Sequence, residues 1–207
     1  MKKTLLIIIL ATLALNTISC KKEKETASEK LAPKTNYVVD TQNSVINWTA
    51  YKTTDKVPVK GVFEQVKITH ANPAENPAEI LEGLEFEIPV ESIFTKDTIR
   101  DSKLKKFFFG TMENSTYLKG KITADSNGGG NVDLTMNGLT KSFPYTYEVN
   151  NETITLVATI DLDNWQAQAA IKALNEVCFD MHKAKDGISK TWNDVAIAVQ
   201  IKTKLEK

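Results

Sequence analysis

Hydrophobic and polar residues alternate along most of the chain from Tyr37 onward. This period of two is typical of β-strands with one buried and one solvent-facing side. It is clear from Leu84 to Val90, where glutamates separate Leu, Phe, Ile and Val, and again from Val195 to Lys202. Further β-rich runs cover 46–51, 57–68, 116–124, 132–136, 143–149 and 153–160.

Short turn sequences connect these runs and indicate hairpins. Asn127-Gly130 and Asn150-Asn151 lie between neighbouring runs, and Asn137-Gly138 is interpreted as turn chemistry rather than a site. Gly61, inside the run 57–68, predicts a bulge or sharp bend. Eight or nine antiparallel strands avoid exposed edges by closing, so the pattern predicts an all-β fold, an eight-stranded antiparallel barrel. A barrel of this size either fills with side chains or holds one small ligand.

Two segments depart from the strand pattern, which adds one or two short helices to the predicted barrel. The first, 96–106, is polar and compatible with a helix, and it ends in three phenylalanines, 107–109, that we expect to cover an end of the barrel. In the second, Asp163 and Gln166 fit a helix-capping box. Apolar residues from Ala167 to Met181 follow at helical spacing, so we expect a helix against the barrel wall or across its end.

The N-terminus has the pattern of an export signal. Lys2 and Lys3 precede an apolar region of eleven residues, 5–15, which is too short to span a bilayer. Residues 17–20, Thr-Ile-Ser-Cys, resemble a lipobox, with an ordinary secretory signal as the alternative. We therefore predict a signal peptide over 1–19, lipidated Cys20 with a flexible tether over 20–35, and a barrel domain over 36–207.

The composition and the motifs of the sequence argue against several classes of chemistry. The chain has 26 basic and 26 acidic residues, so no basic field indicates a nucleic acid partner. No serine-hydrolase elbow, zinc-protease helix, phosphate loop or dinucleotide fingerprint is present. The two histidines, His70 and His182, lack metal-ligand spacing, so we predict no metal site. Cys178 is interpreted as a buried small apolar residue rather than a nucleophile, although His182 follows four residues later.

Four motifs in order resemble the YceI-like polyisoprenoid-binding family. They are Tyr37-x-x-Asp40 with Ser44 and Trp48; Gly61-x-Phe63; Ser92-Ile93-x-Thr95 with Arg100-Asp101-x-x-Leu104 and the phenylalanine run; and residues 134–141, Leu-Thr-Met-Asn-Gly-Leu-Thr-Lys. The resemblance covers roughly Tyr37 to Lys204 and implies an extended lipocalin-like barrel that holds a long isoprenoid chain. The sequence departs from the family at Lys103 and Lys106, where histidine and aspartate are common, and this affects the head-group preference more than the fold.

The resemblance implies that the site is an apolar surface inside the barrel. The apolar candidates for ligand contact are Trp48, Phe63, Phe86, Ile88, Phe108, Leu156, Ile197 and Val199. Their alternative role is to fill a solid core. Arg100 is a further candidate because it can donate to a head-group oxygen at the mouth. The favoured alternative for Arg100-Asp101 is structural: the pair would fix the crossing segment to strand ends.

The function expected from the resemblance is that of an envelope lipoprotein, in the periplasm or at the cell surface, anchored to a membrane through Cys20. It would bind a quinone-like or polyprenol-like isoprenoid for storage or transport, with no catalysis and no cofactor beyond the lipid. A homodimer is an open alternative for its assembly. The functional alternatives are a ligand-free structural lipoprotein and, less favoured, an enzyme that uses Cys178, His182 or Arg100 on an apolar substrate.

Overall fold

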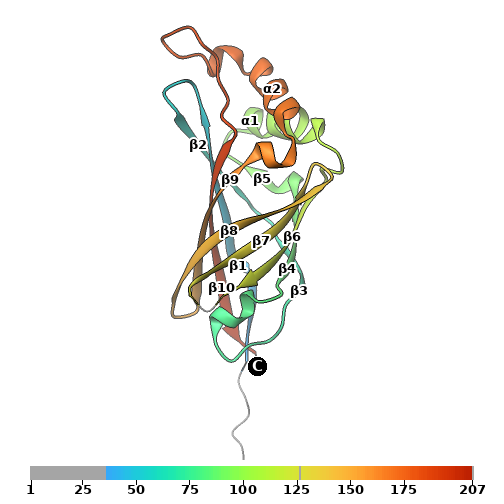
Figure 1. Cartoon of the computed structure of the whole chain (residues 1–207), viewed down its shortest axis with the longest axis vertical. Helices are drawn as coiled ribbons and strands as arrows, with labels where there is room; N and C mark the ends of the chain where they lie inside the picture. The colour runs from blue at the N-terminus through green and yellow to red at the C-terminus, as the bar shows by residue number, and fades with distance from the viewer. Residues whose placement is uncertain (1–35, 126, 207) are drawn as a thin grey trace, which may run out of the picture. The chain divides into compact units, whose positions relative to one another are not determined.

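One antiparallel sheet forms the body of the molecule (Figure 1). The computed structural model describes residues 36–125 and 127–206. In these residues the sheet has the order β3-β4-β6-β7-β8-β9-β10-β1-β2-β5. The strands are β1 (Tyr37–Lys52), β2 (Val57–Phe63), β3 (Lys67–His70), β4 (Glu85–Pro89), β5 (Ile93–Phe94), β6 (Tyr117–Ala124), β7 (Gly129–Met136), β8 (Leu139–Asn150), β9 (Thr153–Asp161) and β10 (Asp194–Leu205).

The sheet closes where two interrupted wall strands pair with each other. Residues 64–66 separate β2 from β3, and the short helix η2 (Val90–Ser92) separates β4 from β5. β3 pairs with β4 and β2 pairs with β5, while the amide of Glu64 donates to the carbonyl of Ser92 at 2.9 Å between the two ladders. The two ends of the strand order therefore meet. The predicted antiparallel barrel is confirmed, and its eight wall positions are made from ten strand segments in the described residues.

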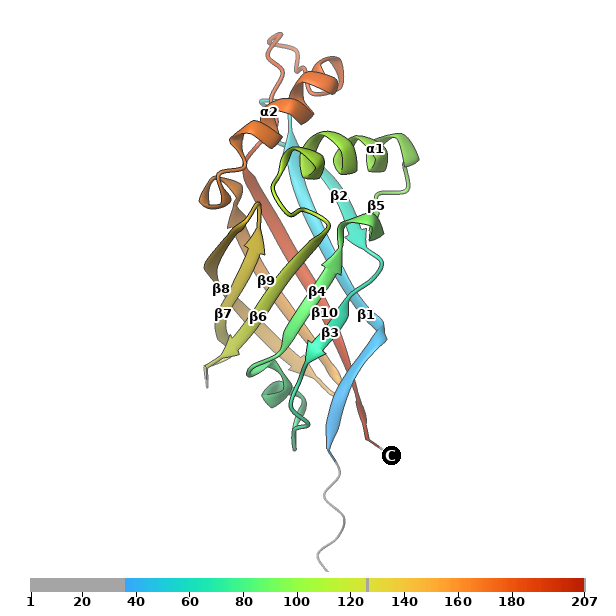
Figure 2. The same ribbon diagram turned by 90° about the vertical axis from the view of Figure 1, so that its right-hand side faces the viewer.

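Helices gather at one end of the barrel (Figure 2). They are η5 (Leu162–Trp165), α2 (Gln168–Val177), η6 (Phe179–Met181), α1 (Thr98–Lys103), the π-helical turn η3 (Leu104–Phe108) and η4 (Phe109–Thr111). Lys103 Nζ ties α1 to α2 by donating to the carbonyl of Val177 at 3.0 Å. At the opposite end lies η1 (Pro77–Leu81), whose Ile80 and Leu81 are fully buried. None of the described helices has the length and apolar character needed to span a bilayer.

The helix predicted over 163–181 is broken, and the predicted capping box is wrong. Asp161, not Asp163, caps η5, and Gln166 has a left-handed backbone with φ of 54° before α2 begins. The cause is Trp165, which is fully buried and donates from Nε1 to the carbonyl of Leu134 at 2.9 Å. These tertiary contacts fix the chain where local propensity alone favours a continuous helix. The apolar side of α2 nevertheless covers the barrel end, as expected.

Two glycines make room for aromatic rings inside the barrel. β1 and β2 pair without a register break through Gly61, so the predicted bulge is wrong. A Cβ on Gly61 would come within 3.0 Å of the Trp48 ring, and a Cβ on Gly120 would come equally close to the Phe86 ring. Each ring thus lies across the backbone of the glycine paired with it in the sheet. Glycine is present because a side chain would occupy the same space as the ring.

We expect Gly120→Ala to destabilise the protein by about 1–3 kcal/mol, the usual cost of overpacking a core. Chemical denaturation with a constant m-value measures this change. In a Phe86→Ala background the same glycine substitution should cost much less, because the ring that it meets is gone. Strictly additive costs in the double variant would show that the contact with Phe86 is not the reason for the glycine.

Candidate functional site

The barrel holds an apolar cavity of about 200 Å³. All ten strand segments contribute at least one side chain to its wall. Apart from two tryptophans, the polar side chains in the wall are those of Ser44 and Thr191. An engineered cavity of about 150 Å³ with an apolar lining stays dry and binds benzene. The cavity in this barrel is therefore large and apolar enough to hold a hydrophobic ligand.

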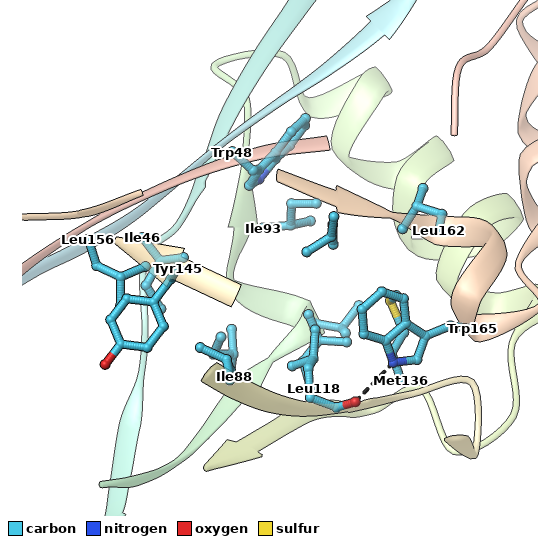
Figure 3. Packing of buried hydrophobic residues seen from close by; sticks show 14 of the residues in the cluster. Ile46, Trp48, Ile88, Ile93, Leu118, Met136, Tyr145, Leu156, Leu162 and Trp165 are labelled. Carbon is cyan, nitrogen blue, oxygen red and sulfur yellow. Dashed lines mark hydrogen bonds between the residues drawn. The ribbon is translucent and has the colours of Figure 1, made fainter. Parts of the chain in front are cut away.

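The strand register explains why these side chains share one face. Trp48 on β1 pairs with Ile197 on β10, and Ile46 pairs with Val199, which in turn pairs with Leu156 on β9. Paired residues lie on the same face of a sheet, and alternate residues along a strand return to that face. The wall therefore consists of continuous rows of aliphatic and aromatic side chains, several of which Figure 3 shows together.

The helical end closes the cavity with further apolar side chains. Phe108 and Phe109 are buried, and their ring centroids lie 4.9 Å apart in an edge-to-face arrangement. Phe109 also meets Phe63 of β2, with centroids 6.4 Å apart. Ile171 and Leu174 of α2 line the same cavity. The expectation that the phenylalanine run covers an end of the barrel is confirmed for Phe108 and Phe109, whereas Phe107 does not line the cavity.

The structure places eight of the nine predicted ligand-binding residues on the cavity wall. They are Trp48, Phe63, Phe86, Ile88, Phe108, Leu156, Ile197 and Val199. Their contact with a ligand stays a prediction. Arg100 is not among the lining residues: its side chain is 42% exposed, and Nη2 lies 3.4 Å from Asp97 Oδ2. Ile171 and Leu174 also line the cavity but are not among the predicted ligand-binding residues, although the apolar stripe of their helix indicated a buried face.

Asp101 has a structural role in the segment that crosses the barrel end. Its carboxylate is buried, and Oδ1 accepts hydrogen bonds from Thr95 N at 2.9 Å and Thr95 Oγ1 at 2.6 Å. Asp97 caps α1 by accepting from the amides of Ile99 and Arg100, and the latter bond is the main cause that lowers the pKa of the Asp97 carboxyl. The structural interpretation of the Arg100-Asp101 pair is thus confirmed for Asp101.

Cys178 and His182 lie in surroundings that disfavour a nucleophile and its base. Cys178 is buried, and burial raises the pKa of its thiol, whereas reactivity requires the thiolate. His182 Nδ1 lies 2.7 Å from Thr191 Oγ1, which donates to Asn175 Oδ1 at 2.9 Å. This chain of bonds connects α2 to the segment before β10. Across residues 36–125 and 127–206, no group of three or more His, Cys, Asp or Glu side chains is placed to hold a metal ion.

The lowered pKa of His182 predicts how the stability of the folded chain depends on pH. Burial first, and then the charges of Lys52 and Lys103, lower this pKa from 6.5 to about 4. Between these values the unfolded chain binds a proton that the folded chain does not. The contribution of His182 to stability is therefore complete above about pH 6.5 and is lost as the pH falls towards 4.

Thermal unfolding from pH 7.5 to 4 measures this loss. His182→Gln should flatten the profile relative to the unmodified chain, while His70→Gln, at an exposed position on β3, serves as the matched control. If the His182 and His70 variants have the same pH profile, the assignment to His182 is wrong.

The closed antiparallel barrel with an apolar interior belongs to the broad class of lipocalin-like folds. Residues 37–203 match the YceI-like domain, and the chain therefore belongs to the YceI-like family. No curated protein sequence matches it.

Two solved structures share the fold at low sequence identity. A polyisoprenoid binding domain from Saccharophagus degradans is 13% identical, with a TM-score of 0.57 over 82% of this chain and 98% of that one. BcnA from Burkholderia cenocepacia is 16% identical, with a TM-score of 0.52 over 81% of this chain and 99% of that one. At these identities the similarity shows the fold alone.

Proposed function

We propose that this protein binds a long, apolar isoprenoid lipid, quinone-like or polyprenol-like, inside the barrel for storage or transport. The observation that carries the proposal is the cavity of about 200 Å³ with an almost wholly apolar wall. An isoprenoid tail offers no hydrogen bonds, so an apolar enclosure is what its recognition requires. Each Å² of buried apolar surface contributes about 25 cal/mol, so a few hundred Å² of tail contact gives useful affinity.

The same cavity favours ligand binding over the two alternatives. A ligand-free structural protein is expected to have an interior filled by side chains, because protein cores are close-packed. An enzyme acting on an apolar substrate needs an activated group at the cavity. The raised pKa of the Cys178 thiol disfavours Cys178 as a nucleophile, and the hydrogen bond of His182 to Thr191 disfavours His182 as its base. The polyisoprenoid binding described for the Saccharophagus degradans domain adds support by similarity of fold.

Membrane attachment completes the proposal. Cys20 and the signal-like segment before it lie outside the described residues, so this part rests on the sequence pattern. An acylated Cys20 would hold the barrel in the cell envelope, in the periplasm or at the cell surface. Tethering near the bilayer that supplies the lipid would raise the effective concentration of the two partners.

A matched pair of substitutions tests ligand binding. Ala50 lines the cavity, whereas Ala198, on the neighbouring strand β10, is exposed outside the barrel. The chain and its Ala50→Phe and Ala198→Phe variants are purified from a bacterial host, extracted with organic solvent and analysed by mass spectrometry. We expect about one isoprenoid per chain in the unmodified protein and in Ala198→Phe, and several-fold less in Ala50→Phe, because the new ring occupies the cavity.

Circular dichroism establishes that all three proteins are folded. Equal isoprenoid content in the three would mean that the lipid comes from co-purified membrane, and a folded, isoprenoid-free chain would favour the structural alternative. Either result would contradict the proposal.

A further inference from the structure

The hydrogen-bond pairing that closes the barrel does not extend along the whole of β1. From Ile46 to Thr49, β1 pairs with β2 on one side and with β10 on the other. Below Ile46 it pairs with β10 alone, although β3 continues β2 in this half of the barrel. β3 pairs with β4 on one side, and in the described chain it has no partner strand on the other. Residues 38–45 and 64–70 therefore border a seam, and Figure 2 shows the lower part of β1, in blue, standing apart from β3.

Both ends of this seam are fixed by backbone pairing. Above it, Ile46 pairs with Phe63. Below it, the amide of Tyr37 donates to the carbonyl of Ala74 at 2.7 Å, and the amide of Ala74 donates back at 3.2 Å. Paired strands lie about 4.8 Å apart, whereas the Cα atoms of β1 and β3 do not approach each other as those of paired strands do. The seam is thus a framed interruption of the wall and not a frayed strand end.

Val39 directs unpaired backbone groups at the seam. Tyr37 points its amide and carbonyl at Ala74, and alternate residues of an antiparallel strand point these groups to the same side. Val39, two residues further on, therefore presents its amide and carbonyl to the seam, where the described residues offer no backbone partner. A strand edge of this kind can form hydrogen bonds with another molecule.

The seam lies against the cavity. Val39 and Ser44 on one side of it, and Val66 and Ile68 on the other, all line the cavity, and each is only partly buried. At the helical end, in contrast, the cavity is covered by buried side chains, which are those of Phe108, Phe109, Leu162 and Leu174. A lipid that entered at the helical end would have to displace these packed side chains. Passage at the seam breaks no backbone hydrogen bond between β1 and β3.

We propose that the isoprenoid enters and leaves the barrel through the seam, and that its polar head group stays there while its tail occupies the cavity. This inference rests on the proposed function and places the head group. No ionisable Lys, Arg, His, Asp or Glu side chain of the described residues lines the cavity, and the hydroxyls of Ser44 and Thr191 already have partners. A head group inside would therefore lose its hydrogen bonds to water without replacement.

At the seam the head group keeps its contact with water, and the free amide and carbonyl of Val39 can bond to it. The barrel then recognises the tail and tolerates head groups of different size and charge.

Photo-cross-linking of the full chain tests the position of the head group. The probe is a geranylgeranyl chain that carries a benzophenone at its oxygen end, and the adducts are mapped by digestion and mass spectrometry. We expect adducts within 38–45 and 64–70, and we expect their loss in Ala50→Phe and in the presence of excess geranylgeraniol.

The outcomes separate the two proposals. Saturable adducts that map elsewhere, such as the helical end at 98–111 or 162–192, would overturn the inference while lipid binding stands. If the folded, unmodified chain forms no more adducts than Ala50→Phe, or if geranylgeraniol does not compete, the proposed function fails, and the inference fails with it.

Exchange rates test the passage of the lipid. Val66→Phe places a ring at the seam, and Val195→Phe is the matched control, because it makes the same change in a wall valine on β10 away from the seam. Stopped-flow quenching of tryptophan fluorescence by a prenylated quinone with two isoprene units gives both rate constants.

Relative to Val195→Phe, association and dissociation in Val66→Phe should both slow about tenfold, which corresponds to about 1.4 kcal/mol at the barrier. The Kd should change less than either rate constant. Equal association rate constants in the two folded variants would contradict entry at the seam. The cross-linking map of the unmodified chain does not depend on either variant being folded.

Discussion

Closure of the sheet is the constraint on which the rest of this structure depends. An open antiparallel sheet leaves backbone donors and acceptors unpaired along its edges, and closure removes them. Here two interrupted wall strands close the sheet. One consists of β2 followed by β3, and the other of β4 followed by β5; β2 pairs with β5, β3 pairs with β4, and the amide of Glu64 donates to the carbonyl of Ser92 between the two ladders. The number of wall positions then sets the width of the interior. In a barrel with eight wall positions, these side chains do not fill the interior completely, and a cavity remains.

Inside the barrel, large aromatic rings lie against glycines, which have no side chain. Trp48 and Phe86 lie across glycines on neighbouring strands, so each ring takes the space of a second side chain and holds its place beside the cavity. The same wall is almost free of polar atoms, which suits a ligand with a hydrocarbon tail. Polar groups in the described chain serve instead to fix its covering segments, as Asp101 does for α1 and the bonds among Asn175, Thr191 and His182 do beyond α2.

The helical end shows how tertiary contacts redirect local preference. The spacing of apolar residues after Ala167 indicated a helix that covers apolar surface, and α2 does so. Its start could not be placed from the capping pattern, because burial of Trp165 and its bond to the carbonyl of Leu134 outweigh the cap at Asp163. A bond between positions 31 residues apart leaves no trace in a local pattern.

The sequence by itself predicted the antiparallel barrel, the aromatic cover that Phe108 and Phe109 provide, and the inward side of the clearly alternating strands such as 84–90 and 195–202, because alternation with period two records burial directly. It did not decide whether those inward side chains fill the interior or surround a cavity, since that depends on volumes summed over all strands. Only the tertiary structure placed Arg100 beside Asp97 instead of on the cavity wall, and only it left the nitrogen of Trp48 without a partner. Both results depend on side-chain directions and on contacts between distant segments, which the order of residues does not reveal.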